Sequence, residues 1–372
     1  MSFSCETAIP IEATRPVPVL RNPWPNGRRP AATRPRSAAR ARAADASLTA
    51  MTDGRNRRES PRRAASNPAP AQSAPVARNV LELIGRTPLV HLSRMEQAGG
   101  ARVWGKAEFL NPAGSVKDRP ALSMIEAAEQ AGKLAPGATL VEATSGNTGI
   151  SLAMIAAVRG YRCILVMPED MSLERRHIMR AYGAEIALTP ATDGMIAAVR
   201  HAEKLVRTTA GAFMPSQFDN PANPHSHYAG TAHELVEQLD GDIDAFVAGV
   251  GTGGTLTGVA RCLRERLAKV LIIAVEPKSS PVLSGGKPGL HAIQGLGAGF
   301  VPANLDRSII DEIVTVSDVA AERTARRLAQ TEGLLVGPSA GANVHVACAV
   351  AQRFTSGNVV TILCDSGERY LF

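Results

Sequence analysis

The stretch "AFVAGVGTGGTLTGVARCLRERL", residues 245–267, predicts a short strand, a glycine-containing turn and a helix that begins near Thr255. Glycines let backbone N–H groups approach an anion closely, and the N-terminus of a helix adds the positive end of its dipole. Thr252 and Thr255 add hydroxyl donors. The turn therefore favours a phosphate cradle, and the alternative is a plain strand-to-helix turn that needs glycine for packing.

The same order of strand and helix recurs along the chain. Short apolar runs precede Ala-rich helical stretches at 138–143 and 149–160, 163–168 and 172–183, 185–190 and 194–211, and 334–341 and 342–354, with further strands at 271–277 and 359–365. This alternation predicts an α/β protein whose parallel sheets are covered on both faces. A length of 372 residues suits two domains with a core each.

The basic charge of the chain belongs to its start. Residues 1–80 hold 14 Arg, no Lys and five acidic residues, which gives them a formal charge of +9. The whole chain carries +7, so the other residues sum to −2. We expect no nucleic-acid partner for the body. The Pro-, Ala- and Arg-rich composition predicts a disordered extension, with an organelle transit peptide or a start codon assigned upstream of Met51 as alternatives.

Several other classes of protein are disfavoured. No apolar run approaches the roughly 18 residues of a membrane span. The five cysteines include no CxxC pair and mostly lie in apolar runs, which favours buried thiols in a reducing compartment. His225 and His227 form an HxH pair without an obvious third ligand, so we expect no metal site.

Two more loops follow predicted strands. "EATSGNTGIS" (142–151) gathers four polar side chains at a helix start, where one would suffice as a cap. The excess favours a bound carboxylate. In "GPSAGAN" (337–343) we expect Ser339 at the top of a strand, where an N-cap serine is the simpler interpretation. Gly249, Gly251 and Gly254 also match dinucleotide-binding spacing, with Glu276 as the acid about 20 residues on.

A single lysine, Lys117, lies in "NPAGSVKDRPAL" (111–122). Taken alone it is most simply a solvated charge, but a desolvated lysine can act as a Schiff-base nucleophile. A phosphate cradle, a carboxylate loop and a serine accompany it here. Together these are parts that a pyridoxal phosphate enzyme needs.

The sequence resembles the fold-type II pyridoxal phosphate enzymes, and within them the cysteine synthases (O-acetylserine sulfhydrylases). "NPAGSVKDR", "EATSGNTGI", "GVGTGGTLTGV", "QGLGAGF" and "SGERYL" carry this resemblance in the same order, over about residues 79–372. It implies two doubly wound parallel-sheet domains of the tryptophan synthase β-like kind, with the cofactor between them. We expect domains at 81–220 and 221–372, with 81–109 packed on the second.

The resemblance also implies roles for individual residues. Lys117 forms the internal aldimine with pyridoxal 5'-phosphate and serves as the catalytic base. The other cofactor-binding residues would be Asn147 at the ring hydroxyl, Ser339 at the pyridine nitrogen, and Gly251, Thr252, Gly253, Gly254 and Thr255 at the phosphate. The substrate carboxylate would bind Thr144, Ser145, Gly146, Thr148 and Gln217.

The implied reaction converts O-acetyl-L-serine and sulfide to L-cysteine through an α-aminoacrylate. The first half of the body resembles the B isozyme, which in some bacteria accepts thiosulfate, and the second half resembles the A isozyme. Alternatives are O-phosphoserine as donor, thiosulfate or homocysteine as nucleophile (the latter as in cystathionine β-synthase), diaminopropionate synthesis, or a non-catalytic regulatory homologue. The family further implies a homodimer that in some members binds serine acetyltransferase. We expect a cytoplasmic location, with organelle import through the Arg-rich extension as the alternative.

Overall fold

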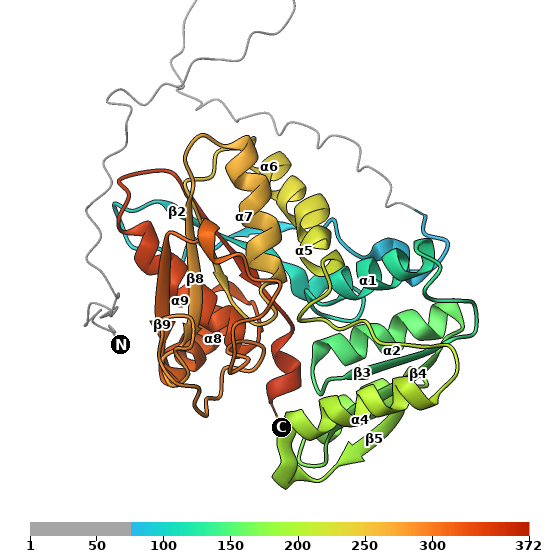
Figure 1. The fold of residues 1–372 in the computed structure, drawn as a ribbon. Helices are drawn as coiled ribbons and strands as arrows, with labels where there is room; N and C mark the ends of the chain where they lie inside the picture. The colour runs from blue at the N-terminus through green and yellow to red at the C-terminus, as the bar shows by residue number, and fades with distance from the viewer. Residues whose placement is uncertain (1–75, 372) are drawn as a thin grey trace, which may run out of the picture. The chain divides into compact units, whose positions relative to one another are not determined.

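The computed structural model describes residues 76–371, and all structural statements refer to these. The predicted extension lies outside this range apart from residues 76–80. Two sheets belong to one compact unit that includes residues 77–371 (Figure 1). Within the described part of the chain, none of the helices combines the length and the apolar character that crossing a membrane requires.

The larger sheet has six strands in the order β1-β2-β10-β7-β8-β9. All neighbours are parallel except β1, which is antiparallel to β2. The strands are β1 (Leu89–His91), β2 (Arg102–Ala107), β7 (Ala245–Gly249), β8 (Leu271–Pro277), β9 (Glu312–Val316) and β10 (Asn358–Leu363). The segment before the lysine loop therefore belongs to the same sheet as the last strand of the chain.

Alternate residues of this sheet face two different cores. Val247 and Ile273 pack with helices α8 (Asp318–Glu332) and α9 (Pro338–Ala351). Phe246 and Ile272 pack with α6 (His233–Gln238) and α7 (Gly254–Arg266). Because both faces are covered, β7 and most of β8 are apolar on both sides, as expected of a parallel sheet.

The smaller sheet has four parallel strands in the order β5-β4-β3-β6. They are β3 (Thr139–Ala143), β4 (Arg162–Pro168), β5 (Glu185–Thr189) and β6 (Ala212–Phe213). Helices α1 (Asp118–Gln130), α2 (Asn147–Arg159) and α3 (Leu173–Ala181) bury one face, and α4 (Gly194–Thr208) buries the other. Figure 1 shows α2 and α4 on opposite sides of these strands.

A short helical run links the two cores. It comprises α5 (Ala222–Ser226), a π-helical turn η4 (His227–Ala232) and α6. π-Helical turns are rare and occur frequently at functional sites. Here the turn lies directly against α7, whose N-terminus is the predicted phosphate cradle.

The predicted α/β fold with parallel sheets is confirmed. One predicted strand is wrong: within 334–341 only Val336 pairs, through an isolated bridge to Ser366, and α9 begins at Pro338. Ser339 consequently lies in the first turn of a helix rather than at the top of a strand. The proline at the first position of α9 explains the early start, because its fixed φ suits a helix N-terminus.

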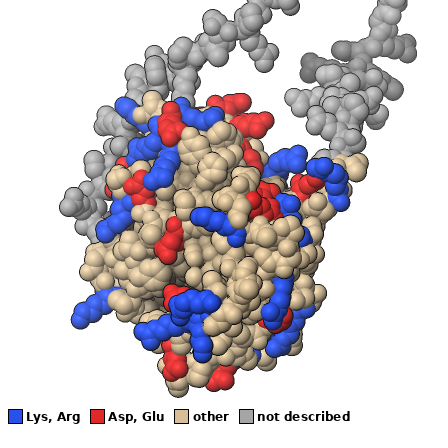
Figure 2. All heavy atoms as spheres, turned by 45° about the vertical axis from the view of Figure 1, so that its right-hand side comes forward, with Lys and Arg blue, Asp and Glu red and all other residues tan. Residues whose placement is uncertain are grey.

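Charged side chains of both signs are interspersed over the face that Figure 2 displays. This mixture agrees with the small net charge calculated for the chain beyond residue 80. It offers no single-sign surface on that face for a polyanionic partner.

Candidate active site

Lys117 lines a cavity at the carboxyl ends of β7 and β10, beside the start of α2. Lys117 directly precedes α1, and the loop before it is closed by hydrogen bonds such as Val116 N–H to the carbonyl of Cys364 at 2.8 Å. Desolvation lowers the pKa of Lys117, although the nearby acidic groups of Cys364 and Asp365 oppose that shift. A lysine with a lowered pKa is more readily available as a free amine.

Seven of the predicted residues line this one cavity: Lys117, Asn147, Gly251, Thr252, Gly253, Thr255 and Ser339. Gly254 is buried at the first position of α7 beside them. The predicted carboxylate-binding residues lie next to the lining rather than in it, at the start of α2 and in the loop after β6. The structure thus gathers residues that are far apart in the sequence.

The glycine loop after β7 leaves no room for side chains. A Cβ on Gly251 would lie 2.2 Å from the carbonyl oxygen of Gly295, and a Cβ on Gly254 would lie 1.9 Å from Asn223 Oδ1. Gly253 has a φ of 82°, which only glycine adopts readily. The loop therefore presents bare backbone at the N-terminus of a 13-residue helix, as an anion-binding site requires.

The two threonines of this loop are held from α5 and from the π-helical turn η4. Thr252 Oγ1 accepts the Asn223 Nδ2 amide at 3.0 Å, and Thr255 Oγ1 lies 3.1 Å from His227 Nε2. The other ring nitrogen of His227 contacts Thr231 Oγ1 at 3.0 Å. Burial first, and then the charges of Arg119 and Lys117, lower the pKa of His227 well below its usual range, so the ring is neutral.

The start of α2 carries the predicted carboxylate loop. Gly146 is its N-cap and makes no side-chain cap, while Thr144 Oγ1 accepts the Gly146 N–H at 3.3 Å. Thr148 Oγ1 donates to Gln217 Oε1 at 2.6 Å. The hydroxyl of Thr148 and the amide of Gln217 are therefore in direct contact, although 69 residues separate them.

Asn147 is positioned by residues near the chain's C-terminus. Its Nδ2 donates to Asp365 Oδ2 at 2.7 Å, and its Oδ1 accepts a hydrogen bond from Arg369. Arg369 also donates to the carbonyl of Ala113 in the lysine loop. The Tyr370 hydroxyl completes the group by donating to Asp365 Oδ2 at 2.5 Å.

Cys364 and Asp365 line the cavity but were not predicted as site residues. Their position directly after β10 is the signal that sequence reasoning missed, because ligands in α/β sheets bind at the carboxyl ends of strands. Burial raises the pKa of Cys364 to about 11, so the group is a thiol. Asp365 Oδ1 is buried and has no hydrogen-bond partner among the described residues.

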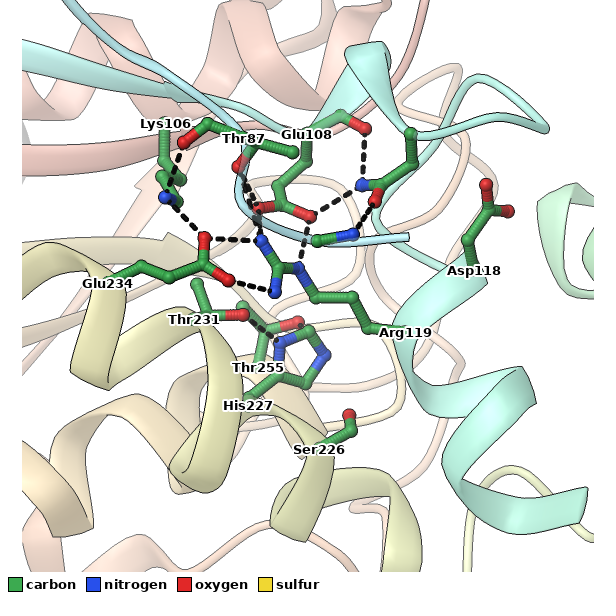
Figure 3. A network of polar contacts seen from close by, with 12 residues as sticks. Thr87, Lys106, Glu108, Asp118, Arg119, Ser226, His227, Thr231, Glu234 and Thr255 are labelled. Atoms are coloured by element: carbon green, nitrogen blue, oxygen red, sulfur yellow. Dashed lines mark hydrogen bonds and ion pairs between the residues drawn. The ribbon is translucent and has the colours of Figure 1, made fainter. Parts of the chain in front are cut away.

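A buried cluster of charges joins both ends of the lysine loop (Figure 3). Arg119 donates to Glu108 Oε2 at 2.8 Å and Oε1 at 2.9 Å, and to Glu234 Oε1 at 2.7 Å and Oε2 at 2.8 Å. Lys106 Nζ lies 2.6 Å from Glu234 Oε2. The loop from Glu108 to Arg119, which carries Lys117, is thus fastened at its beginning and at its end.

Asp118 fastens the same loop to α2. Its carboxylate accepts the Ala113 N–H at 2.7 Å and the Ser151 hydroxyl at 2.5 Å. Burial raises the pKa of Asp118 to about 6, against the lowering effect of these hydrogen bonds. Asp118 therefore connects the loop that carries Lys117 to α2, whose start bears the predicted carboxylate-binding residues.

The formal dinucleotide match has no support from its acidic residue. Glu276 accepts the backbone N–H groups of Leu283 at 2.8 Å and Ser284 at 2.9 Å, so its carboxylate is engaged by a loop of the protein. Within residues 76–371, no group of three or more His, Cys, Asp or Glu is positioned to hold a metal ion.

The residues present fit a phosphorylated aldehyde. A desolvated amine shares its cavity with a side-chain-free helix N-terminus, an asparagine and a serine. This is the arrangement of an enzyme that binds pyridoxal phosphate through a lysine, on a fold of two parallel sheets. The family of pyridoxal-phosphate dependent enzymes matches residues 80–365, and the chain belongs to this family.

Individual relatives agree with this assignment. A protein from Staphylococcus aureus named cysteine synthase is 50% identical over 295 residues, which span 79% of this chain and 95% of the relative. The crystal structure of a cysteine synthase from Entamoeba histolytica has a TM-score of 0.77 at 39% identity, covering 82% of this chain and 92% of that one. An O-ureido-L-serine synthase structure has a TM-score of 0.75 at 46% identity, covering 80% and 94%.

Proposed function

We propose that this chain makes L-cysteine from O-acetyl-L-serine and sulfide by a pyridoxal phosphate-dependent β-replacement. The observation that carries the proposal is the desolvated amine of Lys117 in one cavity with the glycine loop, Asn147 and Ser339. The relative named cysteine synthase, at 50% identity, supports this substrate pair over other chemistry of the same fold. When bound, the cofactor supplies an aldehyde for the substrate amine and a ring that withdraws electrons from its Cα.

The chain's own residues then divide the work. Gly251, Thr252, Gly253, Gly254 and Thr255 would hold the phosphate, and Asn147 would orient the ring. Ser339 would face the pyridine nitrogen, and a serine would not hold that nitrogen protonated as a carboxylate does, so the ring would be a weaker electron sink. Lys117 Nζ takes the proton from the substrate Cα and later returns it.

The substrate carboxylate would bind Thr144, Ser145, Gly146, Thr148 and Gln217. The N-terminus of α2 favours an anion through its dipole and free N–H groups. Thr148 fixes the Oε1 of Gln217, which leaves the Nε2 group of that amide to donate to the substrate. These groups would therefore fix the substrate by its carboxylate.

A donor and nucleophile panel on the purified protein tests this function. We expect cysteine release with O-acetylserine and sulfide, and slower or no release when O-phosphoserine replaces the donor. Thiosulfate and homocysteine in place of sulfide distinguish the B-type and cystathionine alternatives. Product from O-phosphoserine alone would reassign the donor, and no product from any pair would overturn the proposal in favour of a binding role.

We also propose domains at residues 81–220 and 221–372, with 81–109 part of the second. The pairing of β2 with β10, and of β1 with β2, supports that last assignment. A cytoplasmic homodimer and a serine acetyltransferase partner rest on the family resemblance. Light scattering of the purified protein, with and without a serine acetyltransferase, tests the dimer and the partner. If the protein alone has the mass of a dimer and that mass does not increase when the acetyltransferase is added, only the partner proposal is wrong.

A further inference from the structure

Glu142 is a buried carboxyl group that the proposed chemistry does not use. It lies in β3 shortly before Thr144, and 5% of its surface is exposed. Its Oε2 accepts the backbone N–H of Ser216 at 2.8 Å, and the N–H of Gln217 also hydrogen-bonds to the carboxyl group. One side chain therefore ties the strand that leads to α2 to the loop that carries Gln217.

The loop at this point has an unfavourable backbone conformation. Ser216 has a φ of 57°, in the left-handed region that glycine favours. A non-glycine residue keeps such a conformation only where its surroundings determine it strongly. The carboxyl of Glu142 holds the N–H of this turn, while the Ser216 carbonyl accepts N–H groups from Asp219 and Asn220 at 3.0 Å each.

Gln217 connects the two halves of the proposed site. Its Oε1 accepts the Thr148 hydroxyl at 2.6 Å, on the substrate side. Its backbone carbonyl accepts the side-chain amides of Asn223 at 2.7 Å and Asn304 at 2.9 Å. Asn223 also donates to Thr252 of the phosphate loop at 3.0 Å. A shift of Gln217 would therefore move the carboxylate-binding amide relative to the cofactor.

The charge of Glu142 does not oppose an anionic substrate at neutral pH. Burial raises the pKa of Glu142 to about 8, against the lowering effect of the N–H groups of Ser216 and Gln217. The carboxyl group is then largely protonated below that pH. Replacement by glutamine keeps a neutral group of the same size, but its N–H₂ group cannot accept a backbone N–H, whereas both oxygens of the protonated carboxyl group still can.

We propose that Glu142 is a positioning residue for substrate recognition: by holding the Ser216–Gln217 turn, it sets the amide of Gln217 against Thr148 so that the pair binds the donor's carboxylate. The inference rests on the proposed function of the site. It assigns Glu142 no contact with the substrate, the cofactor or the reacting atoms.

Glu142→Gln in the holoenzyme tests this inference, with Glu276→Gln as the matched control. Glu276 is also a buried glutamate near the end of a parallel strand, and it also accepts two successive backbone N–H groups, but those belong to Leu283 and Ser284. We expect E142Q to raise the KM for O-acetylserine roughly tenfold while kcat changes less than about threefold. The cofactor dissociation constant should stay within about twofold of wild type.

A third variant keeps the test valid if E142Q is merely unstable. Adding Ser216→Gly should lower the donor KM of E142Q again, because glycine adopts a φ of 57° without strain. A KM that stays at the E142Q value in the double variant would overturn the role of this turn. Equal effects of E142Q and E276Q on the donor KM would show that both residues act only on the fold.

Failure of the proposed function is distinguishable from failure of this inference. If the wild type releases no cysteine from O-acetylserine and sulfide, the function is wrong whatever the variants do. If the wild type is active and E142Q keeps the wild-type KM, the function stands and the role of Glu142 is wrong.

Discussion

Glu234→Gln removes the charge at the centre of the buried cluster that fastens the lysine loop. The Glu234 side chain is 17% exposed, and its two oxygens accept from Arg119 at 2.7 and 2.8 Å while Lys106 lies 2.6 Å away. Glutamine keeps the shape but directs an N–H₂ group at one of two cations. We expect the variant to be substantially less stable than wild type.

The size of the loss follows from the pKa of Glu234. Burial alone would raise it, but hydrogen bonds and charges from Arg119 and Lys106 outweigh burial and lower it from 4.5 to about 2. A shift of that size corresponds to about 3 kcal/mol, since each unit is worth about 1.4 kcal/mol. It agrees with the roughly 3–5 kcal/mol lost when one partner of a buried pair is removed.

The pKa values of Lys106 and Glu234 do not respond alike to their contact. Burial lowers the pKa of Lys106, against the raising effect of Glu234, so the contact favours the charged form of Lys106 less than that of Glu234. The second cation, Arg119, decides the balance because it donates to both oxygens of Glu234. The pKa of Glu234 is therefore lowered because two cations act on one carboxylate.

The stability contributed by Glu234 depends on pH in a defined direction. Its pKa in the folded protein lies below the unfolded value of 4.5, so the contribution is complete above 4.5 and is lost as the pH falls from there toward 2. The difference in the free energy of unfolding between wild type and E234Q should be constant between pH 8 and 5.5. This difference should become measurably smaller by pH 4.

Urea unfolding followed by circular dichroism at these pH values measures this difference. Glu185→Gln is the matched control, because Glu185 also forms a two-bond pair with Arg162, at 2.7 Å each, but is 54% exposed. We expect the control to cost less than about 1 kcal/mol. A loss in E234Q no larger than that in E185Q, or one that does not change below pH 5, would refute the reasoning.

Three further predictions concern the site. Lys117→Ala should abolish turnover yet leave a folded protein that still binds pyridoxal phosphate, which absorbance after dialysis would show; wild-type turnover would exclude Lys117 as the nucleophile. Gly251→Ala should weaken cofactor binding at least about tenfold in a fluorescence titration, because its Cβ would lie 2.2 Å from the Gly295 carbonyl; unchanged affinity would exclude the loop as the cradle. Because the pKa of Glu142 is raised to about 8 in the folded protein, its contribution to stability is complete below pH 4.5 and is lost as the pH rises through 8. The melting temperature of wild type should therefore fall relative to that of E142Q over this range; a difference in melting temperature that does not change with pH would contradict this.

Much of the fold was predictable from local pattern. The mainly apolar runs at 163–168 and 271–277 coincide with β4 (Arg162–Pro168) and β8 (Leu271–Pro277) because strands covered on both faces are apolar over most of their length. β2 (Arg102–Ala107) was not identified, since "RVWGKA" includes a glycine and a lysine. Lys106 is fully buried in that strand, and its charge is balanced by Glu234, which lies far along the chain.

The site residues were predictable where several of them lie together in one short loop. The glycines at 251–254 and the polar cluster at 144–148 reveal themselves by residue type and spacing. The contacts that hold these loops were not predictable, because they join segments 69 residues apart for Thr148 and Gln217 and 218 residues apart for Asn147 and Asp365. Such pairings depend on the topology of the two sheets rather than on any local signal.

Glu142 and Glu276 show why a glutamate can belong near the carboxyl end of a buried parallel strand. Each interrupts an apolar run, and each accepts the N–H groups of two successive loop residues. Loops that cross the edge of such a sheet bring N–H groups to a place where no neighbouring strand offers carbonyls. A carboxyl group supplies acceptor atoms for two of them from one side chain, whereas an amide supplies one acceptor and adds donors. A buried N–H left without a partner is costly, so the glutamate stabilises its loop even though burial disfavours its charge. The same apolar run that predicts the strand therefore marks, by its one acidic interruption, where a loop is anchored.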